Sequence, residues 1–377
     1  MRTGLDRLLG HEPRSYGRTG WLVNGSAVTS AGFAWGPVAA TASGFTVTQL
    51  FAPEHGAHGA VAAGVPVGDH RDSWTGLPVC SLYGAGQRHV GNALGRCDTV
   101  VIDLPDNGTR YSTYLATSAG LLDAVAAHPS PPRVVVADRP NLLGRRREGP
   151  PLLPGFESIV GRVHVPARHG LTLGEALRAY VRETGIRVDL EVVTAEGWDP
   201  HRMIEHGPYL PPSPNLTSFT AQLLYAGTCL IEGTNVSEGR GTAAPFQMAG
   251  APWLDGPALA AALRADGWPG VLVREVTFIP AASKHQGQPC NGVFLHVSDA
   301  GQVRPVELAV RLLELIFTQS DRTELRSADD GTGPPRFLDR LWGSAGLADH
   351  LASRRTGHFT VAAAEIAGLD AIALYPY

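Results

Sequence analysis

The first half of the chain alternates short apolar runs, rich in β-branched residues, with longer stretches rich in alanine and leucine. This alternation is typical of βαβ units, in which helices connect the strands of a mainly parallel sheet. We expect strands at residues 21–23, 46–51, 99–104, 133–137 and 187–193. Helical spacing predicts helices at 112–128 and 173–184, the second capped by Thr172 or a neighbouring residue. A right-handed, doubly wound sheet is the simplest arrangement of these elements.

The composition of the sequence changes near Trp198, where the proline-rich stretch WDPHRMIEHGPYLPPSPN begins. Proline and glycine interrupt regular structure, so we interpret this stretch as the join between two parts of the chain. Beyond it we expect helices at 218–225, 256–266 and 306–317, and strands at 271–278 and 292–298. A last helix and a last strand are expected after Thr360.

Four successive strands of the predicted sheet run directly into polar loops. In an open parallel sheet, ligands bind outside the carboxyl ends of the strands, because loops and helix amino termini converge there. The loops supply these candidate binding residues: Asn24, Glu54, His55, Asp106, Asn107, Asp138, Arg139 and Asn141. A single such residue is ordinary, since Asp and Asn are common in turns and caps. Four loops in succession favour a site at this edge.

Glu54 is the strongest candidate for catalysis. It follows the apolar run 46–52 and precedes His55 and Gly56, which places its carboxyl at the mouth of the sheet, partly removed from water. A carboxyl in such a place suits a general acid. The structural alternative is that Glu54 caps a helix or pairs with an arginine such as Arg110.

Residues 110–114 follow Gly108 and should open a helix. Tyr111 and Tyr114 stand three residues apart and therefore lie on one helix face. A phenol there can donate a hydrogen bond or stack on a sugar ring, although one of the two could simply pack. Arg110 can bind a carboxylate through two parallel hydrogen bonds.

The glycine-rich stretch 232–242 lies in the second half of the chain, but we expect it to face the same cleft. Its glycines permit close backbone approach and positive φ. The stretch supplies four further candidate binding residues: Glu232, Asn235, Ser237 and Arg240. Arg240 can bind a carboxylate; alternatively, it pairs with Glu232 or Glu238 and only stabilises the join. The residue order fits neither a phosphate-binding loop nor a dinucleotide-binding motif.

Composition and charge narrow the choice of ligand. The chain has 377 residues and a net charge of -4, so no overall field would hold a nucleic acid or an anionic membrane. The four cysteines lack CxxC spacing. His55 and His58 have no third metal-binding residue at a spacing typical of a zinc site. We therefore expect buried thiols, no metal and no organic cofactor. Neither a secretory leader nor a membrane-spanning run is evident, so we expect the protein in the cytoplasm.

A series of short motifs runs through the chain. They are LFAPEHG at 50–56, TGLPV at 75–79, SLYG at 81–84, DRPN at 138–141, EGP at 148–150, RHGLT at 168–172, PSPN at 212–215 and EGTNVSEGRGT at 232–242. A last set comprises Phe278, Pro280, Lys284, Gly287, Cys290 and Gly292. In this order the motifs resemble the signatures of the DUF1343 (NamZ-like) family of exo-acting β-N-acetylmuramidases.

The resemblance implies a Rossmann-like, mainly parallel α/β domain at residues 1–200 that carries the active site, and a smaller α+β domain at 201–377 that contributes to the cleft. It also implies a glycoside hydrolase that releases N-acetylmuramic acid from the non-reducing end of peptidoglycan fragments, with a small saccharide or related molecule as substrate. In this family the glutamate of PEHG and a nearby tyrosine are regarded as catalytic. Here they correspond to Glu54, with Tyr114 and Tyr83 as the candidate phenols.

Most glycosidases use a second carboxyl, for which Asp106, Asp138 and Glu232 are candidates. The sequence also departs from the family, which usually has an arginine soon after PEHG where this chain has His58, and QDVG where this chain has PDNG at 105–108. Two alternatives therefore stay open. One is an enzyme on the same scaffold that acts on another amino sugar or a peptide-like metabolite, and the other is a non-catalytic sugar-binding protein.

Overall fold

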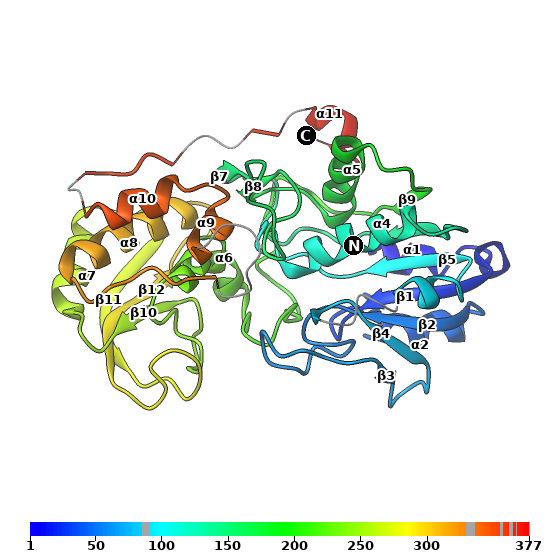
Figure 1. Ribbon diagram of the computed structural model, residues 1–377, viewed down its shortest axis with the longest axis horizontal. Coiled ribbons are helices and arrows are strands. Elements are labelled where there is room, and N and C mark those ends of the chain that lie inside the picture. The colour runs from blue at the N-terminus through cyan, green and yellow to red at the C-terminus, as the bar shows by residue number, and fades with distance from the viewer. Residues whose placement is uncertain (85–89, 329–335, 355–356, 362–364, 367, 377) are drawn as a thin grey trace.

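The computed structural model describes residues 1–84, 90–328, 336–354, 357–361, 365–366 and 368–376. Two bodies lie side by side, one built on a seven-stranded sheet and the other on a three-stranded sheet (Figure 1). This architecture confirms the predicted fold class, a mainly parallel α/β domain followed by a smaller α+β domain. The division at residue 200 stays a prediction.

The large sheet has the strand order β3-β4-β2-β1-β5-β6-β9. Its strands are β1 (Arg18–Val23), β2 (Thr46–Ala52), β3 (His70–Arg71), β4 (Pro78–Ser81), β5 (Thr99–Asp103), β6 (Arg133–Ala137) and β9 (Leu190–Val193). All neighbours pair in parallel except β3 and β4, which are antiparallel at one edge. The loops that follow β1, β2, β5 and β6 therefore emerge at the same end of the sheet.

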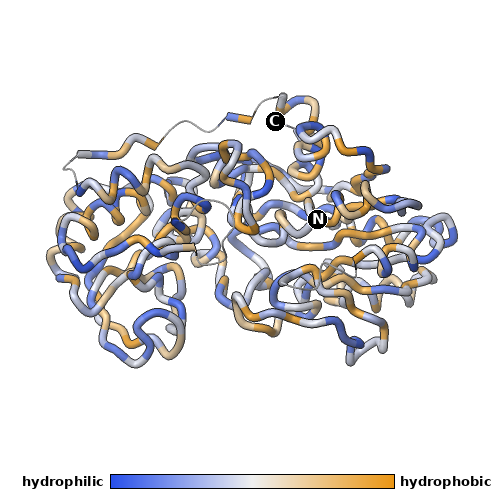
Figure 2. The backbone as a smooth tube through the Cα atoms, in the orientation of Figure 1, coloured by the Kyte–Doolittle hydropathy of each residue, from blue (hydrophilic) through white to orange (hydrophobic). Residues whose placement is uncertain are grey.

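Helices cover both faces of this sheet. Within β1, Trp21 and Val23 pack against one face and Leu22 against the other, and all three are fully buried. Such alternation is expected of a strand that is buried on both sides. One face is covered by α1 (Gly4–Leu8), the 3-10 helix η1 (Pro13–Tyr16) and α2 (Gly36–Ala42), and the other by α3 (Val90–Leu94), α4 (Thr113–Ala126) and α5 (Leu173–Thr184). Figure 2 shows apolar segments running through the interior of both bodies.

Local sequence signals fix the ends of α5. The Thr172 hydroxyl accepts a hydrogen bond from the Glu175 backbone N–H, while the Glu175 carboxylate accepts one from the Thr172 N–H. This reciprocal capping box satisfies donors that the first helical turn leaves free. The helix ends at Gly185, whose φ of 67° is left-handed and costs glycine little. The predicted helix and its cap are confirmed.

The second body contains an antiparallel sheet with the order β10-β12-β11. Its strands are β10 (Met248–Ala251), β11 (Val271–Phe278) and β12 (Cys290–Val297), and its helices are α6 (Phe219–Thr228), the 3-10 helix η3 (Cys229–Gly233), α7 (Gly256–Ala265), α8 (Pro305–Gln319), α9 (Phe337–Trp342) and α10 (Gly346–Ala352). A separate antiparallel pair, β7 (Glu148–Pro151) and β8 (Pro166–Arg168), lies between the two bodies and contacts α8 (Figure 1).

The end of the chain differs from the prediction. A short helix, α11 (Leu369–Ile372), follows Thr360, but the described residues after it contain no strand. The expected strand is therefore wrong for this part of the chain. Instead of pairing with a sheet edge, the tail packs against the first body, where α11 lies on α5 (Figure 1). The Tyr375 phenol donates a hydrogen bond to Asp138 over 2.8 Å.

Candidate active site

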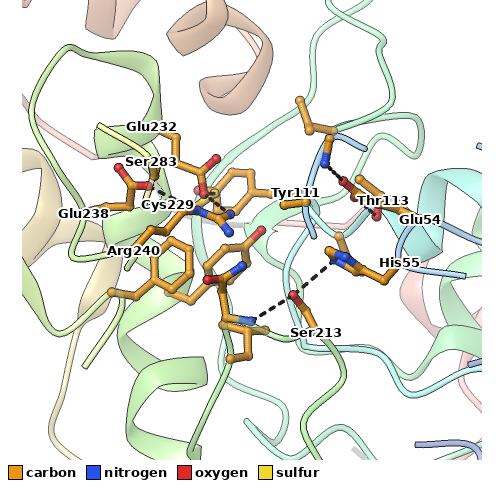
Figure 3. Close-up of a pocket in the computed structure, with 18 of the residues that line it drawn as sticks. Glu54, His55, Tyr111, Thr113, Ser213, Cys229, Glu232, Glu238, Arg240 and Ser283 are labelled. Atoms are coloured by element: carbon orange, nitrogen blue, oxygen red, sulfur yellow. Dashed lines mark hydrogen bonds and ion pairs between the residues drawn. The ribbon is translucent and has the colours of Figure 1, made fainter. Parts of the chain in front are cut away.

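A cavity of about 590 Å³ lies between the carboxyl edge of the large sheet and the second body (Figure 3). The loops after β2 and β5 and the first turn of α4 form one wall, and the glycine-rich stretch 232–242 forms part of the other. Its lining includes Glu54, His55, Tyr83, Asn107, Tyr111, Thr113, Tyr114, Ser213, Cys229, Glu232, Glu238, Arg240 and Lys284. Residues far apart in the sequence thus share one cavity.

Glu54 lies at the mouth of the sheet, as the sequence predicts. Pro53 separates it from β2, and its side chain is buried. One carboxylate oxygen accepts a hydrogen bond from the Gly64 N–H over 2.8 Å, and the other accepts one from the Thr113 hydroxyl over 2.9 Å (Figure 3). Within the described residues Glu54 forms no ion pair. The suggested pairing with Arg110 is wrong, because the Arg110 guanidinium is occupied elsewhere.

The two candidate phenols differ in their surroundings. Burial, and then the neighbouring Glu54 carboxylate, raise the pKa of Tyr83 to about 12. Burial also raises the pKa of Tyr114 well above its ordinary value, so both phenols keep their protons at neutral pH. The Tyr114 hydroxyl donates to the Pro212 carbonyl over 2.6 Å and accepts a hydrogen bond from Asn24 over 3.2 Å. Asn24 is almost fully buried and lies behind Tyr114, so it positions that phenol and does not line the cavity.

His55 sits in a sharply turned loop, with a left-handed φ of 72°. Its Nδ1 lies 2.8 Å from the Val61 carbonyl and must carry the hydrogen, because a carbonyl only accepts. Its Nε2 then accepts from the Ser213 hydroxyl over 3.2 Å. His58 lies outside the cavity lining, where its Nε2 contacts Asp72 over 2.5 Å. Both histidines are hydrogen-bonded loop residues, as expected.

The opposite wall is charged and internally balanced. Arg240 pairs with Glu232 over 2.8 Å and with Glu238 over 3.2 Å (Figure 3). Lys284 pairs with Glu238 over 2.8 Å. Burial alone would lower the pKa of Arg240, but the two glutamates raise it above its ordinary value. Arg240 thus lines the cavity, as the ligand-binding interpretation predicts, and it also forms the ion pairs with Glu232 and Glu238 that the structural interpretation predicts. One of its nitrogens, Nη1, is buried and has no hydrogen-bond partner in the described structure.

Several residues expected to bind substrate are turned away from the cavity. Arg110 is fully buried and donates to three backbone carbonyls, at distances of 2.7, 2.9 and 2.8 Å. Asp138 accepts hydrogen bonds from the Gly174 N–H and the Tyr375 hydroxyl. Asn141 donates to the Leu171 carbonyl. These side chains satisfy buried polar groups, so they hold the loops in place and do not line the cavity in the described structure.

Of the remaining predicted binding residues, some line the cavity and others do not. Arg139 pairs with Asp103 over 2.6 Å, and Asp106 lies 3.0 Å from His169, both outside the cavity lining. Asn107 does line the cavity, although its side-chain oxygen accepts hydrogen bonds from Thr109. Tyr111 also lines the cavity. Its buried hydroxyl donates to the carbonyl of Ala226 over 3.4 Å.

In the glycine-rich stretch, Asn235 and Ser237 have structural contacts. The Asn235 amide donates to the Arg322 carbonyl and accepts from the Glu324 N–H. The buried Ser237 hydroxyl accepts from the Gly239 N–H. Neither side chain lines the cavity, because both are used to fold the stretch on itself and against its neighbours. Glu232 and Arg240 remain as its predicted cavity residues.

Sequence reasoning missed the residues that hold or surround these side chains. They are Gly64, Thr113, Ser213 and Lys284. Glu238 was expected only as a partner of Arg240. Ser213 and Lys284 belong to the motifs that resemble the family, but the motifs gave no indication of what these two residues do. The contact between Thr113 and Glu54 joins residues 59 positions apart, and no local pattern could reveal it.

The described residues contain no group of three His, Cys, Asp or Glu side chains that could hold a metal ion. All four cysteines are free and buried, as expected. No helix of the described chain is long and apolar enough to cross a membrane.

Both halves of the chain match known family models. Residues 19–220 match the model described as the N-terminal part of exo-β-N-acetylmuramidase NamZ, and residues 223–365 match its C-terminal counterpart. Together with the cavity at the sheet edge, these matches define a two-domain glycosidase. The chain belongs to the NamZ family of exo-β-N-acetylmuramidases, which confirms the resemblance of its motifs.

Individual relatives agree with this assignment. The chain is 36% identical over 325 residues to the peptidoglycan β-N-acetylmuramidase NamZ of Bacillus subtilis, a match that covers 84% of this chain and 77% of the relative. Its fold is similar to the crystal structure of a DUF1343 family protein from Bacteroides fragilis, with a TM-score of 0.81 and 26% identity over 94% of this chain and 91% of that one. A second DUF1343 protein from that organism, with a TM-score of 0.69, 24% identity and the same coverage, shares the fold.

Proposed function

We propose that this glycosidase releases N-acetylmuramic acid from the non-reducing end of peptidoglycan fragments, with Glu54 as its general acid. The observation that carries the proposal is the presence of two groups in one cavity: the Glu54 carboxyl and the Arg240 guanidinium. The first can protonate a leaving oxygen, and the second can bind a carboxylate. The named activity of the Bacillus subtilis relative supports the choice of substrate.

In the proposed step, Glu54 gives its proton to the glycosidic oxygen as the bond to the anomeric carbon breaks, and a water molecule then bonds to that carbon and releases a proton, so that hydrolysis balances. A general acid has to be held in both protonation states. The Thr113 hydroxyl suits this task, because it can donate to the carboxylate and accept from the protonated acid. The Gly64 N–H fixes the other carboxylate oxygen.

Tyr83 is the better candidate for the assisting phenol. The Tyr114 hydroxyl already donates to the Pro212 carbonyl, so its proton is committed to the fold. Tyr83 lies beside Glu54 and remains protonated at neutral pH. It can therefore donate a hydrogen bond to the Glu54 carboxylate that remains once the acid has given up its proton.

Among the three carboxyls considered as a second catalytic group, only Glu232 lines the cavity. Asp106 lies against His169 and Asp138 binds Tyr375, both away from the cavity. We therefore favour Glu232 as the second carboxyl. In glycosidases that use two carboxyl groups, the distance between these groups decides whether the configuration at the anomeric carbon is retained or inverted.

Arg240 is proposed to select for muramic acid. This sugar differs from N-acetylglucosamine by a lactyl ether that ends in a carboxylate. The Arg240 Nη1 has no partner in the described structure, so its N–H groups remain for such a ligand. A charge-assisted hydrogen bond in a partly desolvated cavity would discriminate strongly between the two sugars.

The proposal is tested by incubating the protein with peptide-free glycan chains that begin with muramic acid and analysing the released monosaccharides. N-acetylmuramic acid should appear first, and the Glu54→Gln variant should release none at a comparable rate. Release of N-acetylglucosamine, or of no sugar, would favour the alternatives of a different substrate or a binding protein. The cytoplasmic location stays a prediction, which cell fractionation would check.

A further inference from the structure

A second cavity, of about 810 Å³, borders the first. Ile159 lines both cavities, and the adjacent residues Leu82 and Tyr83 line one each. Helix α4 runs along both: its first turn, at Thr113, faces the Glu54 cavity, and its later turns, as far as Ala124, face the second. Ten residues of helix correspond to about 15 Å, so the two cavities follow one another along α4.

The second cavity has a mixed lining rich in hydrogen-bond acceptors. Its carboxylates are Asp123, Glu157 and Glu183, and its nitrogen bases are Arg162 and His164. Arg162 pairs with Asp123, and His164 contacts both glutamates, one of them over 2.9 Å. These side chains are between 26 and 42% exposed, so they can also reach a ligand. An excess of carboxylates favours ligands that donate hydrogen bonds.

Thr117 adds a hydroxyl group to the lining of the second cavity. It lines the second cavity, is 5% exposed, and its hydroxyl has no hydrogen-bond partner within the described structure. A threonine inside a helix usually bonds to the carbonyl one turn earlier. A buried hydroxyl without a partner is unfavourable, and a ligand group that bonds to it would remove this penalty.

We infer that the second cavity binds the sugars that follow the cleaved unit, through their hydroxyl groups and acetamido N–H groups. This inference rests on the proposed function, which places the terminal muramic acid beside Glu54 and Arg240. The leaving oxygen at Glu54 then lies at the start of α4, and the rest of the glycan runs along that helix. The apolar side chains of Leu121 and Ile159 supply surface for the carbon-bound hydrogens of the sugar rings.

The test compares a short substrate with a long one. 4-Nitrophenyl N-acetyl-β-muramide has a single small ring beyond the cleaved bond, whereas a peptide-free tetrasaccharide that begins with muramic acid has three sugars there and extends along the second cavity. Gly120 offers a way to fill the second cavity, since a Cβ there meets only Arg162, at 3.9 Å. Gly91→Met is the matched control, because Gly91 is exposed on α3, has open space at its Cβ and does not line the cavity.

Gly120→Met should raise KM for the tetrasaccharide by about tenfold or more, and Thr117→Val by about fivefold through the loss of one hydrogen bond. Both variants, and the Gly91→Met control, should cleave the nitrophenyl muramide at the wild-type rate. Unchanged tetrasaccharide kinetics in Gly120→Met, or equal losses on both substrates, would overturn the inference. If the wild type fails to cleave the nitrophenyl muramide, the proposed function itself fails, so the two failures are distinguishable.

Discussion

At the level of single residues, Glu54 is held by one backbone donor and one hydroxyl that can either donate or accept. Glutamine keeps both contacts but cannot supply a proton. Glu54→Gln should therefore fold normally and lower kcat by about 100-fold or more, as loss of a general acid does. Steady-state kinetics and thermal unfolding measure the two effects. Glu191→Gln, on strand β9 outside the cavity, is the control, and a folded Glu54→Gln variant with full kcat would remove Glu54 from the chemistry.

Arg240 permits a test of substrate recognition that is separate from catalysis. Arg240→Lys keeps the charge but loses the planar guanidinium fork. Binding of N-acetylmuramic acid should weaken by about tenfold to a hundredfold, while binding of its uncharged methyl ester should hardly change. Isothermal titration calorimetry with both sugars measures the difference.

Arg264→Lys is the matched control for this substitution, since Arg264 forms an exposed pair with Glu275 and neither residue lines the cavity. Equal weakening of both sugars by Arg240→Lys would mean that the residue only supports the wall through Glu232 and Glu238.

The sequence located the side chains at the sheet edge but not the direction in which each one points. Glu54 and Asn107 line the cavity, whereas Asp138 and Arg110 turn toward buried backbone groups. All four stand in loops that follow strands. Their orientation depends on partners such as Gly174, which is 36 positions from Asp138, and local patterns do not contain that information.

At the level of elements, Asp138 joins the end of β6, the start of α5 and the tail. Burial raises its pKa from an ordinary 3.8 to about 6, so the folded state favours the protonated carboxyl. The raised pKa therefore contributes its full stabilising free energy below about pH 4, and this contribution is lost as the pH rises through about 6. Relative to Asp138→Asn, which cannot ionise, the free energy of unfolding of the wild type should fall by about 3 kcal/mol over this window. Urea denaturation at several pH values measures it, and a constant difference would contradict the argument.

Long elements with a clear period were predictable. Strand β11 and helix α5 have the expected bounds, because residue-by-residue alternation and a capping box mark them in the sequence. The short strands β3, β4, β7, β8 and β10 were missed, since two to four residues are too few to show a period. Their positions depend on neighbouring strands and not on their own composition.

At the level of the whole molecule, the cavity is assembled from two bodies that each bring one kind of chemistry. The first supplies a buried carboxyl and phenols, and the second supplies a charged wall around Arg240. The tail returns from the second body to the first, where Leu374 and Tyr375 bond to Glu175 and Asp138. The tail thus forms a second connection between the two bodies, in addition to the stretch of chain near residue 200.

The most direct test of the proposed function is a comparison of two chromogenic substrates, 4-nitrophenyl N-acetyl-β-muramide and the matching β-N-acetylglucosaminide. The proposed roles of Glu54 and Arg240 predict hydrolysis of the muramide, with kcat/KM at least about tenfold above that of the glucosaminide, because only the muramide offers Arg240 a carboxylate. Equal hydrolysis of both, preference for the glucosaminide, or hydrolysis of neither by the folded protein would contradict the account.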